Sequence, residues 1–203
     1  MNTSSLSFLL GSCPVALAAV VALTTSCAAD SSVVYRQGPM VLDHASADLD
    51  LDQDGIPDFR FTAGTLTSLP SPGAPSTSTP YLDTFAFNRN DYLLNVEGHI
   101  VLKESDFKFG PKPKAGENWG HRDSESQVMA CAAGNTWPGF TGNPPQAFLG
   151  VRFLSKGRWH YGWIRFVVPQ TNPPSAFPVI ADWAYESRPD TAIRAGERPG
   201  KAK

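Results

Sequence analysis

Charged residues are scarce in this sequence. They make up 18% of the 203 residues, against roughly 25% in ordinary soluble domains. The formal net charge is −2, so the chain lacks the basic surface typical of nucleic-acid-binding proteins, and we expect no nucleic-acid partner. The hydrophobic fraction of 41% and the aromatic fraction of 11% argue against a disordered chain. Length and composition together indicate one moderate domain, or a domain with a tail.

Charge is absent altogether from residues 1–29. Within them, the mostly apolar run at 8–23 is interrupted by Pro14 and is shorter than the about 20 apolar residues that span a membrane. An apolar run followed by small residues is typical of a secretory signal, although the usual positive charge before the run is missing here. The alternative is a buried N-terminal helix. We therefore expect residues 1–28 to be an export signal.

Two fates are open at the end of this segment. A signal peptidase would cut after Ala28, because Ser26 and Ala28 place small residues at −3 and −1, and the protein would be secreted. Alternatively, Cys27 becomes a lipidated N-terminus. The stretch 23–27 resembles a bacterial lipobox, with Thr24 where that pattern prefers Leu. This resemblance implies a periplasmic or outer-membrane lipoprotein, attached to the membrane only through a lipid anchor at Cys27.

Cysteine is also scarce, with three residues in the chain. Cys13 lies inside the signal, and Cys27 is either acylated or removed. Only Cys131 then remains, so a processed chain has no internal disulfide. Cys131 is either a small buried hydrophobe or a nucleophile. The domain must therefore be stabilised by its core, either alone or together with a metal.

Helical periodicity is weak after residue 30, and strand signals recur instead. Phe148–Leu154 and Arg158–Val168 predict two strands joined by a turn at 155–157, where Gly157 supplies a positive φ. Val179–Glu186 predicts a further strand. Many short strands with Pro- and Gly-rich turns indicate an all-β fold. We predict a single β-sandwich or jelly-roll-like domain at 31–196, with a Pro-rich loop at 66–80 and a flexible tail at 197–203.

The predicted strand Arg158–Val168 carries large apolar side chains on both faces. Tyr161 and Trp163 alternate with Ile164 and Phe166. This pattern indicates either a central strand covered on each side, or a strand with one wet face rich in aromatics.

The strongest chemical signal is an acidic segment at 48–58. Aspartates recur at every second residue, and Gly55 permits a sharp turn. Calcium takes six to eight oxygen ligands, and without a cation such carboxylates would repel one another by about 1 kcal/mol per pair. The alternative is a solvated acidic turn. We predict a structural Ca²⁺ site, with magnesium a weaker candidate because it demands octahedral geometry. Its ligands would be Asp50, Asp52, Asp54, the backbone carbonyl of Ile56, and Asp58.

The D-x-D-x-D-G-x-x-D string resembles the calcium loops of FG-GAP repeats in integrin-type propellers. It is similar more loosely to the loops of EF-hands and thrombospondin type 3 repeats. An EF-hand would need Glu at the twelfth position, where Phe61 stands, and flanking helices, whereas Phe59–Thr62 reads as a strand. The loop occurs once, so the resemblance implies a calcium loop on a β-hairpin and no propeller.

A second resemblance covers about residues 45–196. The strings FLGVRF, HYGWI and DWAYE, after an acidic segment, are similar to uncharacterised exported bacterial proteins of the PEP-CTERM-associated type. The chain ends in GERPGKAK, without a PEP motif. That family has no agreed activity, so the resemblance implies export and a fold, and no mechanism.

Common catalytic motifs are missing. The sequence contains no H-x-H, H-E-x-x-H or G-x-S-x-G motif and no Walker-type loop. Trp119 and Trp137 lie in Gly-, Pro- and Asn-rich stretches, so we expect them to be exposed and name them as candidates for stacking on a ligand. The leading hypothesis is a non-enzymatic envelope or extracellular module that binds a glycan or a cell-surface partner. The alternative is a glycoside hydrolase-like enzyme on the same scaffold, because a carboxylate pair for glycosidic cleavage leaves no sequence spacing to recognise.

Overall fold

The computed structural model describes residues 32–42, 44–68, 76–121, 127–132, 136–170 and 177–200. The chain divides into two units, Met1–Asp30 and Ser31–Lys203, and every described residue belongs to the second unit. The predicted signal at 1–28, including Cys27, therefore lies outside the described residues. So do residues 69–75 of the Pro-rich loop, and residues 201–203 of the tail.

The described residues form strands and no helix, which confirms the all-β prediction. The predicted strand at Val179–Glu186 is observed with those bounds, and the predicted pair before it is observed within two residues at each end. The strands are β1 (Val33–Val41), β2 (Ser46–Leu49), β3 (Phe59–Ser68), β4 (Thr77–Ala86), β5 (Asp91–Asn95), β6 (Leu102–Lys103), β7 (Lys108–Phe109), β8 (Glu117–Gly120), β9 (Gln127–Cys131), β10 (Gln146–Ser155), β11 (Arg158–Val167), β12 (Val179–Glu186) and β13 (Ile193–Arg194).

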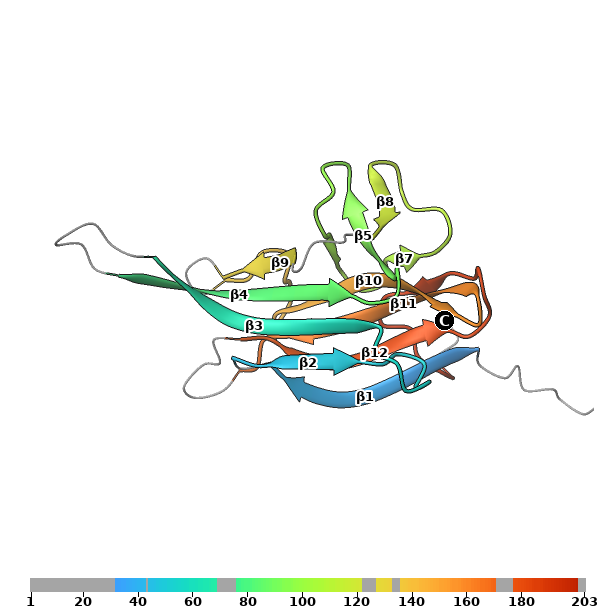
Figure 1. Cartoon of the computed structure of the whole chain (residues 1–203), viewed down its shortest axis with the longest axis horizontal. Helices are drawn as coiled ribbons and strands as arrows, with labels where there is room; N and C mark the ends of the chain where they lie inside the picture. Colours follow the sequence, from blue (N-terminus) through green and yellow to red (C-terminus); the bar gives the residue numbers. More distant parts are fainter. Residues whose placement is uncertain are drawn as a thin grey trace, which may run out of the picture. The chain divides into compact units, whose positions relative to one another are not determined.

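These strands build two antiparallel sheets and a short ribbon (Figure 1). The main sheet has the order β1-β12-β11-β10-β5-β8, and β6 also pairs with β10. The second sheet has the order β2-β3-β4-β9, and the ribbon pairs β13 with β7. The sheets pack against each other through a shared core, so the domain is sandwich-like.

One face of the main sheet packs against the second sheet. Leu149 of β10 and Ile164 and Phe166 of β11 contribute to this core from the main sheet. Phe61 of β3 and Leu82 of β4 enter it from the second sheet, and all five are fully buried. The rings of Phe61 and Phe166 meet edge to face, with centroids 5.3 Å apart, a preferred aromatic geometry.

The other face of the main sheet is covered as well. Phe148 and Trp163 form a second core there with Phe109 of β7 and Ile193 of β13. The strand β11 therefore lies in the middle of a sheet with two buried faces, and the first of the two interpretations of its sequence is confirmed. Apolar side chains at successive positions are what such a strand requires.

A buried ion cluster stabilises this second face. The carboxylate of Asp182 is inaccessible to solvent and accepts two hydrogen bonds from Arg165, at 2.7 Å each. It also accepts one from Arg198 at 2.7 Å and one from the Tyr35 hydroxyl at 2.8 Å. Two guanidinium groups and a phenol thus compensate the charge, which would be costly to bury unpaired.

The ring of Phe109 packs directly over Gly150 of β10. A Cβ added at Gly150 would lie 2.3 Å from a ring atom of Phe109, which is itself almost fully buried. We expect Gly150→Ala to lower the free energy of unfolding by about 1–3 kcal/mol, because the ring must move in a filled core. Urea denaturation measures this change.

The matched control is Gly38→Ala in β1, where an added Cβ meets nothing within 4 Å. We expect this variant to stay within about 0.5 kcal/mol of the parent. Equal losses in the two variants would contradict the packing argument.

Candidate functional site

The acidic segment forms the loop between β2 and β3. Its base is closed by the pairing of Leu49 with Phe59 and by a backbone hydrogen bond of 2.9 Å from the amide of Asp58 to the carbonyl of Leu49. The side chain of Leu51 is fully buried in the core. The loop is thus fixed at both of its ends and at one internal residue.

Three carboxylates of this loop converge. Oxygen atoms of Asp50, Asp52 and Asp58 lie within 4.8 Å of one another. Asp54 does not belong to this group; its side chain is exposed and accepts a 2.8 Å hydrogen bond from the amide of Ile56. The side chain of Ile56 is 55% exposed.

Backbone amides hold the converging carboxylates in place. One oxygen of Asp50 accepts from the amide of Gln53 at 2.7 Å, and the other accepts from the amide of Gly55 at 2.8 Å. This curl needs a positive φ at Gln53 and at Gly55, which have φ values of 62° and 91°. Glycine adopts that conformation without strain, as the sequence predicts.

Asp58 is the buried member of the group, with 7% of its surface exposed. Its carboxylate accepts hydrogen bonds of 2.8 Å from the amide of Leu51 and from the side-chain amide of Asn90. Burial raises the pKa of Asp58 to about 6, and the negative charges of Asp52 and Asp50 add to this effect. The ionised group therefore lies in a site where added positive charge would stabilise it.

The donor set fits a hard divalent cation. All three converging side chains offer carboxylate oxygens, the ligand type that calcium prefers. A carboxylate has about four lone-pair positions, so an oxygen that accepts one N–H bond can still face a cation. Thiolate and imidazole, which favour zinc, do not occur in this group.

Comparison with protein-family models finds no match to this chain, and searches of curated proteins and of solved structures find none either. In the described part of the chain there is no helix long and apolar enough to cross a membrane.

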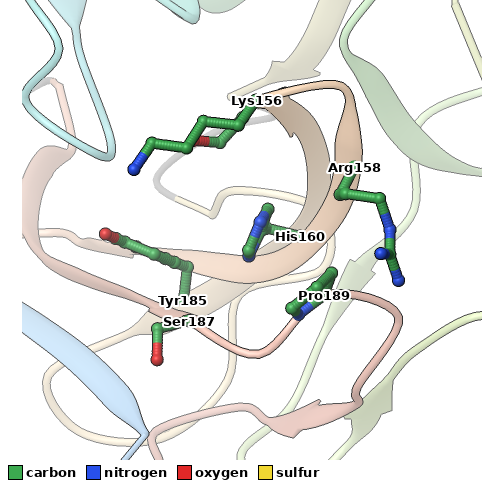
Figure 2. Close-up of a pocket in the computed structure, with 7 residues that line it drawn as sticks. Lys156, Arg158, His160, Tyr185, Ser187 and Pro189 are labelled. Atoms are coloured by element: carbon green, nitrogen blue, oxygen red, sulfur yellow. The ribbon is translucent and has the colours of Figure 1, made fainter.

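A pocket of about 360 Å³ lies at the turn between β10 and β11 (Figure 2). Tyr185 links it to the acidic loop: burial raises the pKa of this phenol, and the charges of Asp52, Asp58 and Asp50 raise it further, whereas Arg36 lowers it. This pocket has no motif in the sequence. Its signals there are the turn at 155–157 and the alternate residues around His160. The pocket is lined by Ser155, Lys156, Arg158, His160, Tyr185, Ser187 and Pro189.

The two tryptophans predicted to stack on a ligand, Trp119 and Trp137, pack against different cores and do not form one binding surface. Trp137 is only 7% exposed and packs in the core between the sheets, so the expectation that it is exposed is wrong. Trp119 is partly buried against the opposite core, where its indole N–H donates to the carbonyl of Gly110 at 2.9 Å. Gly- and Pro-rich surroundings indicate a loop, but they do not determine which way a large apolar side chain in that loop turns.

The raised pKa of Asp58 predicts a pH-dependent stability in the metal-free protein. The folded value of about 6 lies above the unfolded value of about 3.9, so the folded state binds the proton more tightly. The contribution of Asp58 to the free energy of unfolding should therefore fall as pH rises from about 4 to about 6.

The change Asp58→Asn removes this titration. The stability of the parent minus that of the variant, measured by urea denaturation across this pH window without metal, should decrease with rising pH. If this difference in stability stays constant or increases with pH, ionisation of Asp58 does not destabilise the folded state.

Proposed function

We propose that this chain is an exported β-sandwich module whose β2–β3 loop binds a structural Ca²⁺. The observation that carries the proposal is the convergence of the Asp50, Asp52 and Asp58 carboxylates, one of them buried. Calcium is favoured over magnesium because a loop held by backbone hydrogen bonds suits an ion that tolerates irregular coordination. Asp54 and the carbonyl of Ile56 are proposed as further ligands on the sequence pattern alone.

The position of the loop supports a stabilising role for the ion. The side-chain amide of Asn90 donates to Asp58, and its carbonyl oxygen accepts from the amide of Leu154 at 3.1 Å. Asp58 borders β3 of the second sheet, and Leu154 belongs to β10 of the main sheet. An ion bound by Asp58 would therefore strengthen a link between the two sheets.

We propose a non-enzymatic role in the cell envelope or outside the cell, with a glycan or a cell-surface molecule as the partner. No observation among the described residues favours the glycoside hydrolase alternative. The pocket beside Tyr185 has no Asp or Glu in its lining. A second pocket of about 510 Å³, lined by residues such as Gln37, Gln146 and Arg165, has none either.

Calcium should raise the thermal stability of the purified domain. At a free concentration of about 100 times its dissociation constant, a ligand of the folded state adds roughly 2.7 kcal/mol to the free energy of unfolding. Thermal melts with and without Ca²⁺, together with calorimetric titration, measure this gain. We expect a smaller gain with Mg²⁺.

The variant Asp52→Asn should abolish the gain, because it removes one converging carboxylate. The matched control is Asp48→Asn, which removes an exposed carboxylate paired with Arg60 outside the group and should keep the gain. Asp54→Asn decides whether that residue is a ligand. Calcium that fails to stabilise the parent protein, or that stabilises Asp52→Asn equally, would refute the site.

Export is tested on the mature protein. After expression of the full chain in a bacterial host, mass spectrometry should find one of two N-termini. Cleavage behind Ala28 gives a chain that begins at Ala29, whereas lipidation gives a chain that begins at a diacylated Cys27. Cys27→Ser should leave the first product unchanged and eliminate the second. A chain that keeps residues 1–28 in the cytosol would contradict export.

A further inference from the structure

The pocket beside Tyr185 is built from alternate residues of three neighbouring strands. Ser155 ends β10 and faces Arg158 at the start of β11. His160 follows two residues later on the same face, as alternation in a strand requires. Tyr185 of β12, paired with Gly162, continues this face, and Ser187 follows just beyond the end of β12. The groups are thus positioned by sheet geometry.

The hairpin turn adds Lys156 to this wall. Lys156 and Gly157 both have positive φ, at 50° and 74°, as in the tight turns that join antiparallel strands. Figure 2 shows the Lys156 ammonium and the Tyr185 hydroxyl ending on the same side of the pocket, with the His160 ring between Tyr185 and Pro189. The turn therefore places a cation at the pocket without the need for a long loop.

The charge of the lining is positive. Lys156 and Arg158 line the pocket together with no acidic side chain. Arg158 donates to Asp190 at 3.1 Å, and its guanidinium points away from the Lys156 ammonium (Figure 2), so Lys156 is the cation that a ligand on the Tyr185 side would meet. Lys156 has no ion-pair partner among the residues that the structure describes. A ligand with negative charge would complement this lining.

His160 adds a hydrogen-bond acceptor. Its Nδ1 lies 3.0 Å from the backbone carbonyl of Glu186, and because a carbonyl only accepts, Nδ1 carries the proton. The neutral ring then presents a lone pair at Nε2, which no group in the described part of the chain contacts by a hydrogen bond. The ring is 8% exposed, and it lines the pocket. A hydroxyl group in the pocket could donate to Nε2.

We propose that this pocket binds a small oxyanion that also carries a hydroxyl group. Lys156 and the Tyr185 hydroxyl, which end on the same side of the pocket (Figure 2), donate hydrogen bonds to the charged oxygens, and the hydroxyl of the ligand donates to Nε2 of His160. Hydrogen phosphate and the carboxylate of an acidic sugar share this chemistry. The volume of about 360 Å³ lies at the lower end of the roughly 300–1,000 Å³ of small-molecule pockets.

The test is calorimetric titration of the purified domain with phosphate and, separately, with glucuronate, in metal-free Tris chloride. The result is then independent of the calcium site. Binding of phosphate alone assigns the pocket to phosphate groups, and tighter binding of glucuronate assigns it to acidic sugars. Failure of both to bind overturns the proposal.

The variant Lys156→Asn should weaken binding at least about tenfold, because it removes one charged donor. Asparagine suits the positive φ of this turn, so the hairpin should fold as before. The matched control, Lys112→Asn, removes an exposed lysine outside the pocket and should bind like the parent. Equal weakening in both variants would mean non-specific attraction by net charge, and would overturn the proposal.

Sulfate distinguishes the role of His160, because it has charged oxygens and no hydroxyl at neutral pH. We expect sulfate to bind more weakly than phosphate to the parent. His160→Phe keeps a ring against Phe153 and Tyr185 and should bind the two anions about equally. If the variant retains the preference for phosphate, or if the parent prefers sulfate, the assigned role of His160 is wrong.

Discussion

The buried carboxylate of Asp58 connects the acidic loop to the two sheets of this domain. It accepts hydrogen bonds from Leu51 within its own loop and from Asn90 on the chain that leads into β5. The same Asn90 side chain accepts from the amide of Leu154, two residues before Lys156. Hydrogen bonds through Asn90 thus join the acidic loop to the end of the β10–β11 hairpin. Burying this negative charge is costly, as its raised pKa shows, and a cation bound there would offset that cost.

The main sheet holds its strands, and the polar side chains on them, in fixed positions. Both of its faces are covered, by the second sheet on one side and by the β7–β13 ribbon on the other. Packing on two sides fixes the strands, and the ion cluster around Asp182 adds directional bonds from Arg165, Arg198 and Tyr35. Where the core between the two sheets ends, at the β10–β11 turn, the next residues on the same face line the pocket instead.

Much of the fold could be predicted from local patterns. Alternation and turn residues located β10, β11 and β12, because strand pairing across a short turn is a local event. The apolar side chains on both faces of β11 were compatible with two interpretations, a strand covered on each side or a strand with one solvent-exposed face. Composition could not decide between them, since it does not reveal what packs against the strand. The exposure of Trp137 was predicted wrongly for a related reason. A loop is identified by its small residues, whereas the direction of its largest side chain is decided by the nearest apolar cavity.

The all-β fold and the clustering of aspartates around Gly55 could be inferred from the chain alone, because strand alternation and turn conformation depend on neighbours along the chain. Which carboxylates converge depends on the three-dimensional fold, since Asp58 meets Asp50 and Asp52 through the closing of the loop against Leu49 and Asn90. The fold alone also brought Lys156 and His160 together with Tyr185, whose strand lies some distance along the chain. Such contacts depend on strand order and register, which are set by the packing of the whole domain.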